Sequence, residues 1–211
     1  MQSESREVHW QNVYTTKAEA GVSWFQENPE PSLQLMAEVE ATPASAIIDI
    51  GGGASRLVDR LIDRGFEDLT VLDLSGAALE AAKARLGGRA ASVQWIVADV
   101  TVWEPSKAYD IWHDRAAFHF LSGHDDRVAY VARLTRALKT GGYAIIATFA
   151  PDGPEQCSGL PVVRYDANGL AQVLGPAFEL VHTRRHAHAT PWGSVQSFQF
   201  SVFRRRSQVA K

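Results

Sequence analysis

The sequence contains very little cysteine, since Cys157 is the single one among 211 residues. One thiol cannot form a disulfide within the chain, and it is too few for a structural zinc site built from thiolates. We therefore expect neither a disulfide framework nor a metal site. A chain without disulfides suits a reducing compartment, so we expect a cytoplasmic protein.

Long apolar runs and clusters of positive charge are also missing. No stretch resembles a signal peptide or a transmembrane helix, so we expect no membrane partner. Lysine and arginine total 21 against 24 aspartate and glutamate residues, and the basic residues are scattered except at 204–206. This distribution predicts no nucleic-acid partner. The hydrophobic content of 45% over 211 residues suits one α/β domain with a real core.

The clearest pattern is a strand, a glycine turn, a helix and a second strand between Ala46 and Asp73. The apolar residues 46–50 run into three glycines, residues 57–62 repeat apolar side chains at helical spacing, and residues 69–72 form the second strand. Glycines let the backbone approach a ligand, and the following helix presents unpaired N–H groups. Because a carboxylate at the tip of the second strand can accept both hydroxyls of a ribose, the unit predicts a nucleoside-containing cofactor.

The details of the glycine turn indicate which cofactor. A dinucleotide turn reads G-x-G-x-x-G, but Arg56 stands where its third glycine belongs. The run D-I-G-G-G-A-S, residues 49–55, resembles the D-x-G-x-G-x-S motif of class I S-adenosylmethionine-dependent methyltransferases. This resemblance implies that S-adenosyl-L-methionine is bound by the residues Asp49, Gly51, Gly53, Asp73 and Leu74. The alternative is a structural glycine turn without a ligand.

Two later segments carry the same resemblance. A third strand over residues 93–98 ends at Asp99 and Val100, where the family places contacts to the adenine amino group and to a ring nitrogen. The structural alternative for Asp99 is a helix N-cap. The run L-K-T-G-G, residues 138–142, precedes another strand, and one of its glycines is expected to end a helix in the left-handed conformation.

The resemblance implies a Rossmann-like α/β fold. We expect a seven-stranded, mainly parallel sheet with helices on both faces, and an antiparallel last strand inserted between the fifth and the sixth. Residues 178–189 and 195–204 read as the final hairpin. Ser75 and Asp166 are expected to cap helices over 77–86 and 167–174.

Aromatic residues are concentrated ahead of the first strand. In the family this segment often forms a lid, so we expect residues 1–45 to form a helical, aromatic lid and residues 46–211 the methyltransferase domain. Residues 1–7 are polar and are expected to be frayed. Trp10 and Trp24 are candidate substrate contacts and Tyr14 is a candidate cofactor contact, unless these rings simply pack on the sheet.

A fourth strand over residues 109–112 leads into His113, Asp114 and Arg115. Because ligands bind at the carboxyl ends of parallel strands, these three residues are expected to face the transferred methyl group. The segment resembles the W-D-R run of thiopurine-type and tellurite-resistance-type methyltransferases, with His113 as an extra residue. Asp114, His119 and His113 are the candidate catalytic bases and Arg115 is a candidate substrate contact, whereas packing is the alternative for His119.

Three histidines, His182, His186 and His188, share one face of a predicted strand. A metal site is one interpretation, and a polar face or a substrate wall is the other. The loop over residues 151–161, rich in proline and glycine, leaves the fifth strand beside the predicted pocket and is a candidate substrate contact.

The sequence therefore predicts an S-adenosylmethionine-dependent methyltransferase that acts on a small-molecule acceptor through sulfur, nitrogen or oxygen. A protein lysine methyltransferase is the alternative within this chemistry. From other classes, an NAD(P)-dependent reductase is disfavoured by Arg56 and by the lack of a Y-x-x-x-K pair, and a non-catalytic nucleotide-binding module stays open. The acceptor and the oligomeric state are not specified by these residues.

Overall fold

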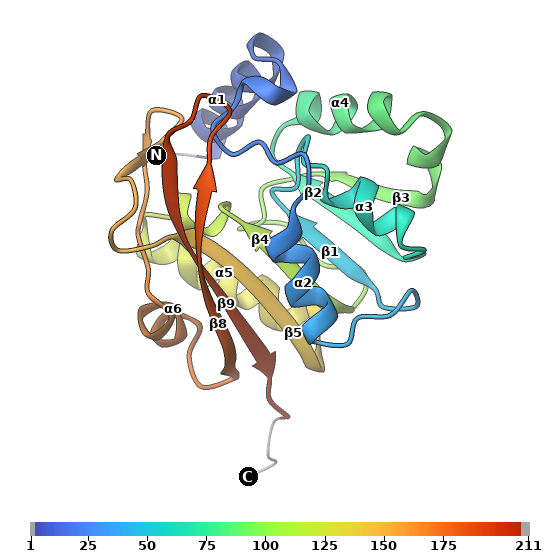
Figure 1. Ribbon diagram of the computed structural model, residues 1–211. Helices are drawn as coiled ribbons and strands as arrows, with labels where there is room; N and C mark the ends of the chain where they lie inside the picture. The colour runs from blue at the N-terminus through green and yellow to red at the C-terminus, as the bar shows by residue number, and fades with distance from the viewer. Residues whose placement is uncertain (1–2, 208–211) are drawn as a thin grey trace.

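A seven-stranded sheet runs through the middle of the molecule (Figure 1). The computed structural model describes residues 3–207, with side chains from Arg6 onward. The strands of this sheet are β1 (Ile47–Ile50), β2 (Leu69–Asp73), β3 (Val93–Val97), β4 (Tyr109–Arg115), β5 (Leu138–Phe149), β8 (Phe178–Ala189) and β9 (Val195–Arg205). Their order is β3-β2-β1-β4-β5-β9-β8, while β6 (Gln156–Cys157) and β7 (Leu160–Pro161) form a small separate hairpin.

The pairing directions confirm the predicted sheet. The pairs β3–β2, β2–β1, β1–β4 and β4–β5 are parallel, whereas β9 is antiparallel to both β5 and β8. A hairpin after the sixth long strand lets the last strand return between the fifth and the sixth. The carboxyl ends of β1 to β5 therefore all meet at one edge.

Helices cover both faces of the sheet, as expected. One core lies under α2 (Glu30–Glu38), α3 (Leu57–Asp63) and α4 (Gly76–Leu86), and the other under α5 (His124–Ala137) and α6 (Ala167–Leu174). Ile47 belongs to the first core and Ile48 to the second, because neighbouring residues of a strand point to opposite faces. In Figure 1, α2 lies in front of the sheet, α5 lies behind it, and α1 (Ser3–Thr16) lies at its upper end.

The two predicted N-caps are confirmed. The Ser75 hydroxyl accepts a hydrogen bond from the Ala78 amide (3.2 Å), and α4 begins at the next residue. The Asp166 carboxylate accepts from the Gly169 amide (2.6 Å) at the start of α6. Both caps occupy amide groups that a helix leaves unpaired at its first turn.

Three expectations differ from the structure. The N-terminal segment is helical from Ser3, because packing of α1 orders it, while Met1 and Gln2 lie outside the described residues. Strand β4 extends to Arg115 because its parallel pairing with β5 continues to Ala147. Gly141 is left-handed (φ 82°) but does not end α5, which stops at Ala137; it lies in an irregular turn within β5.

Candidate functional site

A cavity opens where the carboxyl ends of the central strands meet α1. It encloses about 870 Å³ counted out to its mouth. Of the residues predicted for the site, nine line it: Trp10, Tyr14, Trp24, Gly51, Asp73, Leu74, Asp99, Val100 and Arg115. Asp49, Gly53, His113, Asp114 and His119 are not among its lining residues. The structure thus brings together the strand-tip acids and the N-terminal aromatic residues.

The glycine turn needs residues without a Cβ atom. Gly51 and Gly53 have positive φ values of 65° and 47°. A Cβ atom on Gly51 would lie 2.7 Å from the Ala117 Cβ, and one on Gly53 would lie 3.0 Å from both an Asp73 carboxylate oxygen and the Tyr14 hydroxyl. Glycine therefore lets the backbone approach the neighbouring strand tips and any ligand held there.

Asp73 presents a buried carboxylate at the tip of β2. Its side chain accepts a hydrogen bond from the Ser75 amide (2.7 Å). Burial, and secondarily the charge of Asp49, raises the pKa of this carboxyl to about 7, although the amides of Ser75, Gly53 and Leu74 favour the ionised form. A carboxylate held this way is suited to accept hydrogen bonds from the hydroxyls of a bound sugar.

Asp99 at the end of β3 is held by two groups. One carboxylate oxygen accepts from the Thr101 amide (2.9 Å) and hydroxyl (2.7 Å), and the other accepts from the Arg6 guanidinium (3.2 Å). Arg6 also pairs with Asp126 (3.1 Å) at the start of α5. Asp99 therefore anchors a turn rather than a helix, and still faces the cavity. Sequence reasoning missed Arg6, because a single arginine in a polar N-terminal segment gives no signal.

Helix α1 roofs the cavity with one face. Arg6, Trp10 and Tyr14 are four residues apart and all line the cavity. The helix is fastened to α4, because the Gln11 side-chain oxygen accepts hydrogen bonds from the Ser75 hydroxyl (3.1 Å) and the Ala77 amide (3.2 Å). This contact fixes the aromatic face of α1 over the strand tips.

The aromatic residues contact one another across the cavity. The Trp24 indole donates to the Tyr14 hydroxyl oxygen (3.3 Å), and the ring centroids of Trp10 and Trp24 are 5.6 Å apart in an edge-to-face arrangement. Trp10 also meets Phe120 edge to face at 5.0 Å. Burial, and secondarily the charge of Asp73, raises the pKa of the Tyr14 hydroxyl. This hydroxyl is therefore neutral at physiological pH and can donate a hydrogen bond.

His113 does not face the cavity, contrary to expectation. Its imidazole lies between the Asp49 carboxylate (Nδ1 to Oδ1, 2.6 Å) and the Ser32 hydroxyl (Nε2 to Oγ, 2.8 Å), and all three residues are buried. The reason is that β4 continues through His113 instead of ending at Trp112. His113 therefore pairs in register with Asp49, and both side chains point to the face of the sheet that α2 covers. His113 therefore links β1 to α2.

Asp114 also points away from the cavity. Its carboxylate accepts hydrogen bonds from the Ala117 amide (2.8 Å) and from the Tyr130 hydroxyl (2.7 Å), and it is fully buried on the α5 face. Burial raises its pKa to about 6 despite these donors. Asp114 thus holds the turn that follows β4, and its expected position beside the methyl group is corrected.

His119 lies behind the cavity wall. Its ring packs against Phe120 and Phe149, with centroids at 4.5 and 4.8 Å, and both phenylalanines line the cavity. Its Nδ1 atom accepts from the Phe149 amide (3.3 Å), which places the proton of the neutral ring on Nε2. Burial, and secondarily the charge of Arg115, lowers its pKa to about 3. This geometry favours the packing alternative.

Arg115 is the one residue of the 113–115 run that reaches the cavity. Its guanidinium donates to the backbone carbonyl of Trp24 and lies over the ring of Phe198, with 5.6 Å from Cζ to the ring centroid. Cys157 lines the same region, so the loop over residues 151–161 does contribute to the wall. Sequence reasoning missed Phe149 and Phe198, because a phenylalanine in a buried strand gives no signal that distinguishes a cavity-lining position from a core position.

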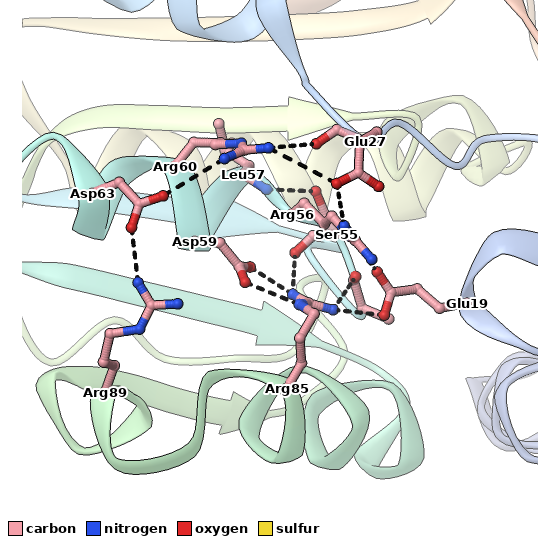
Figure 2. Close-up of polar contacts among 11 residues, drawn as sticks. Glu19, Glu27, Ser55, Arg56, Leu57, Asp59, Arg60, Asp63, Arg85 and Arg89 are labelled. Atoms are coloured by element: carbon pink, nitrogen blue, oxygen red, sulfur yellow. Dashed lines mark hydrogen bonds and ion pairs between the residues drawn. The ribbon is translucent and has the colours of Figure 1, made fainter.

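An ion-pair network fastens the N-terminal segment to the glycine turn (Figure 2). Glu19 contacts the guanidinium of Arg56 (2.8 Å) and that of Arg85 (3.0 Å), and Arg85 also pairs with Asp59 (2.6 Å). Arg56 binds Glu27 as well. Arg56, which replaces the third glycine of a dinucleotide turn, therefore ties the segment after α1 to the start of α3.

The three histidines of β8 have separate partners. His182 lies beside Glu38 (3.3 Å), the His186 ring meets that of Phe200 edge to face (6.1 Å between centroids), and the His188 ring contacts the Ser23 carbonyl oxygen (2.7 Å). Among residues 6–207, no group of three or more histidine, cysteine, aspartate or glutamate side chains is arranged to hold a metal ion. Within the same part of the chain, no helix is both long and apolar enough to cross a membrane.

Comparisons with known proteins agree with this geometry. Residues 47–142 match the methyltransferase domain family. The trans-aconitate 2-methyltransferase of Rhizobium rhizogenes is 30% identical over 149 residues, which cover 70% of this chain and 55% of that protein. The enzyme of the same name from Acidovorax sp. JS42 is 32% identical, covering 63% of this chain and 48% of that protein. The chain thus spans about half the length of these curated relatives.

A solved structure has the same fold. The N-methyltransferase NodS from Bradyrhizobium japonicum WM9, in complex with S-adenosylhomocysteine, superimposes with a TM-score of 0.72 at 16% sequence identity, covering 95% of this chain and 99% of that one. The glycine cradle and the acids at the tips of β2 and β3 fit S-adenosylmethionine. The sequence matches thus place residues 47–142 in the methyltransferase domain family, and the fold is that of class I S-adenosylmethionine-dependent methyltransferases.

Proposed function

We propose that this protein transfers a methyl group from S-adenosylmethionine to a small-molecule nucleophile. The observation that carries the proposal is the lining of the site: two strand-tip acids, an aromatic wall and Arg115 all face one cavity roofed by α1. A protein lysine methyltransferase would need an extended or acidic groove for its peptide. The cavity beneath α1 is mainly apolar, which supports a small acceptor.

The cofactor would be held by the strand tips. We assign the ribose hydroxyls to Asp73, the adenine to Asp99 and the Val100 backbone, and the close backbone approach to Gly51 and Gly53. Leu74 and Tyr14 also line the cavity. Asp49 does not line it, but its contact with His113 holds the end of β1 just before the glycine turn. The bound sulfonium supplies an activated methyl group, so the protein's task is to align the acceptor and exclude water.

The acceptor atom can be sulfur, nitrogen or oxygen, provided that it arrives deprotonated. His113, Asp114 and His119 do not line the cavity, and the lining residues Tyr14 and Cys157 have pKa values raised by burial. Asp73 and Asp99 are assigned to the cofactor. No lining residue is therefore left to take a proton from an amine or an alcohol, which favours an acceptor that is already an anion at neutral pH.

Thermal denaturation with S-adenosylhomocysteine, beside NADH, tests the cofactor. A ligand present at 100 times its dissociation constant adds about 2.7 kcal/mol of stability. We expect stabilisation by S-adenosylhomocysteine, and stabilisation by NADH alone would support a reductase and overturn the proposal.

A screen with radiolabelled methyl donor then tests turnover. The panel contains thiols, amines, carboxylates and protein extracts, and it includes trans-aconitate because the curated relatives are named for it. Transfer to a small molecule supports the proposal. Labelling confined to protein would support the lysine methyltransferase alternative, and cofactor binding without any transfer would support a non-catalytic module.

A further inference from the structure

Arg115 carries a positive charge that forms no ion pair with any carboxylate among the described side chains, residues 6–207. Within this part of the chain, ion pairs are formed by Arg6, which lines the same cavity, and by Arg56, which lines a smaller neighbouring hollow. None joins Arg115 to an acid, and its recorded contacts are the Trp24 carbonyl and the Phe198 ring. The nearby Asp49 is engaged by His113 instead. The half-buried guanidinium of Arg115 thus has one recorded hydrogen bond, to a neutral carbonyl, and no recorded ion pair.

The charge of Arg115 affects the pKa values of the histidines around it. Burial lowers the pKa of Arg115 itself to about 10. After burial, the charge of Arg115 is the next cause that lowers the pKa values of His119, His186 and His188. These histidines are therefore neutral around it, and the end of the cavity keeps a net positive charge at physiological pH.

Partial burial removes water from the Arg115 charge, so an opposite charge beside it is favourable, and a guanidinium is the side chain best shaped to bind a carboxylate through two parallel hydrogen bonds. The adjoining wall is apolar, because Phe149, Phe198 and Cys157 line it. We propose that this end of the cavity binds an acceptor that carries a carboxylate on an apolar body, and that Arg115 is the group that holds this carboxylate. The inference rests on the proposed methyltransferase function and names the substrate class of the same site.

Two carboxylates could reach Arg115: that of the acceptor and that of the cofactor's own amino-acid tail. Arg115 also lines a smaller hollow with Ala54 and Ser55, next to the glycine turn. The position of its guanidinium over Phe198, which comes from the hairpin on the far side of β5, favours the acceptor. The experiment must separate these two sources.

The first arm tests the cofactor source. The affinities of S-adenosylhomocysteine and of 5′-methylthioadenosine, which lacks the amino-acid tail, are measured by calorimetry for the native protein and for Arg115→Gln. We expect the ratio of the two affinities to change less than twofold in the variant. A tenfold or larger loss for S-adenosylhomocysteine with unchanged methylthioadenosine binding would assign Arg115 to the cofactor tail and overturn the proposal.

The second arm tests the acceptor source. The complex with S-adenosylhomocysteine is titrated with benzoate, phenylacetate and hexanoate, each beside its uncharged amide, and the tryptophan fluorescence is followed because Trp24 adjoins Arg115. We expect at least one carboxylate to bind ten times more tightly than its amide. This preference should disappear in Arg115→Gln. It should persist in part in Arg115→Lys, which keeps the positive charge but cannot donate two parallel hydrogen bonds to one carboxylate.

A matched control is Arg205→Gln. Arg205 also donates to a backbone carbonyl, that of Leu138, but it is not a lining residue of the cavity. Loss of the carboxylate preference in this control as well, or no preference in the native complex, would overturn the proposal. Because cofactor binding is measured separately, failure of the carboxylate assignment is distinguishable from failure of the methyltransferase function.

Discussion

Replacing Asp73 by asparagine should weaken cofactor binding without disturbing the fold. Asparagine keeps the size of the side chain and still offers one oxygen to the Ser75 amide. The ribose hydroxyls, however, would lose a charged acceptor, and a hydrogen bond to a charged group contributes about 1.5–3 kcal/mol. We therefore expect the dissociation constant of S-adenosylhomocysteine to rise roughly 10- to 150-fold at pH 8.

The pH dependence provides a second signature of the same residue. The hydroxyls donate to the ionised carboxylate, so binding requires Asp73 to lose its proton. Because its pKa is about 7 in the free protein, the native affinity should be constant above pH 8 and fall about tenfold per pH unit below pH 7. The Asp73→Asn variant has no proton to lose there, so its affinity should not follow this slope.

Stability should respond in the opposite direction. Folding raises the pKa of Asp73 from 3.8 to about 7, so the folded state favours the protonated form. The stability that this carboxyl contributes is therefore present at low pH and is lost as the pH rises through 7. The melting temperature of Asp73→Asn relative to the native protein should consequently increase between pH 4 and pH 8.

Calorimetric titrations from pH 5.5 to 8.5, together with thermal melts, measure these effects. Asp166→Asn is a suitable control, because Asp166 caps α6 and asparagine is an equally good cap. Unchanged affinity in Asp73→Asn at pH 8, or identical pH profiles for the variant and the native protein, would refute the assignment of Asp73 to the ribose.

Three other substitutions test the supports of the site. His113→Phe leaves the buried Asp49 without its ion-pair partner and should lower the free energy of unfolding by about 3–5 kcal/mol in denaturant titrations; a change below about 1 kcal/mol would contradict this. Gly52→Ala places a Cβ atom 2.6 Å from an Asp49 carboxylate oxygen and should destabilise by about 1–3 kcal/mol, whereas Gly88→Ala, with open space around it, should not. Glu19→Gln removes two ion pairs of Figure 2; it should change stability by less than about 1 kcal/mol yet speed amide hydrogen exchange at residues 19–28, and equal exchange rates would count against the latch.

The positions of the strand-tip acids could be predicted from the sequence because their geometry is local. A strand that ends in Asp73 or Asp99 fixes where the carboxylate stands, and a glycine turn fixes the backbone beside it. The cavity lining includes both of these acids. The order and direction of the strands followed from the resemblance to class I methyltransferases and are those observed.

The rest of the cavity could be predicted only in part: Trp10, Trp24 and Arg115 line it as expected, but long-range pairing decides the positions of the other residues. Whether His113, Asp114 or Arg115 faces the cavity depends on how far β4 continues against β5, and the sequence places that end three residues too early. Arg6 reaches Asp99 across 93 positions of the chain. Such contacts depend on which surfaces the folded layers bring together, and no local pattern encodes them.

The hairpin of β8 and β9 places Phe198 in the cavity wall, although it lies well beyond the matched segment 47–142. Trp10 and Trp24 lie ahead of that segment. Several residues that the proposed function assigns to the acceptor therefore lie on either side of the matched segment, while Arg115 lies within it. Exchange of the β8–β9 hairpin is therefore expected to reshape the cavity wall at Phe198 while leaving Asp73 and Asp99 in place.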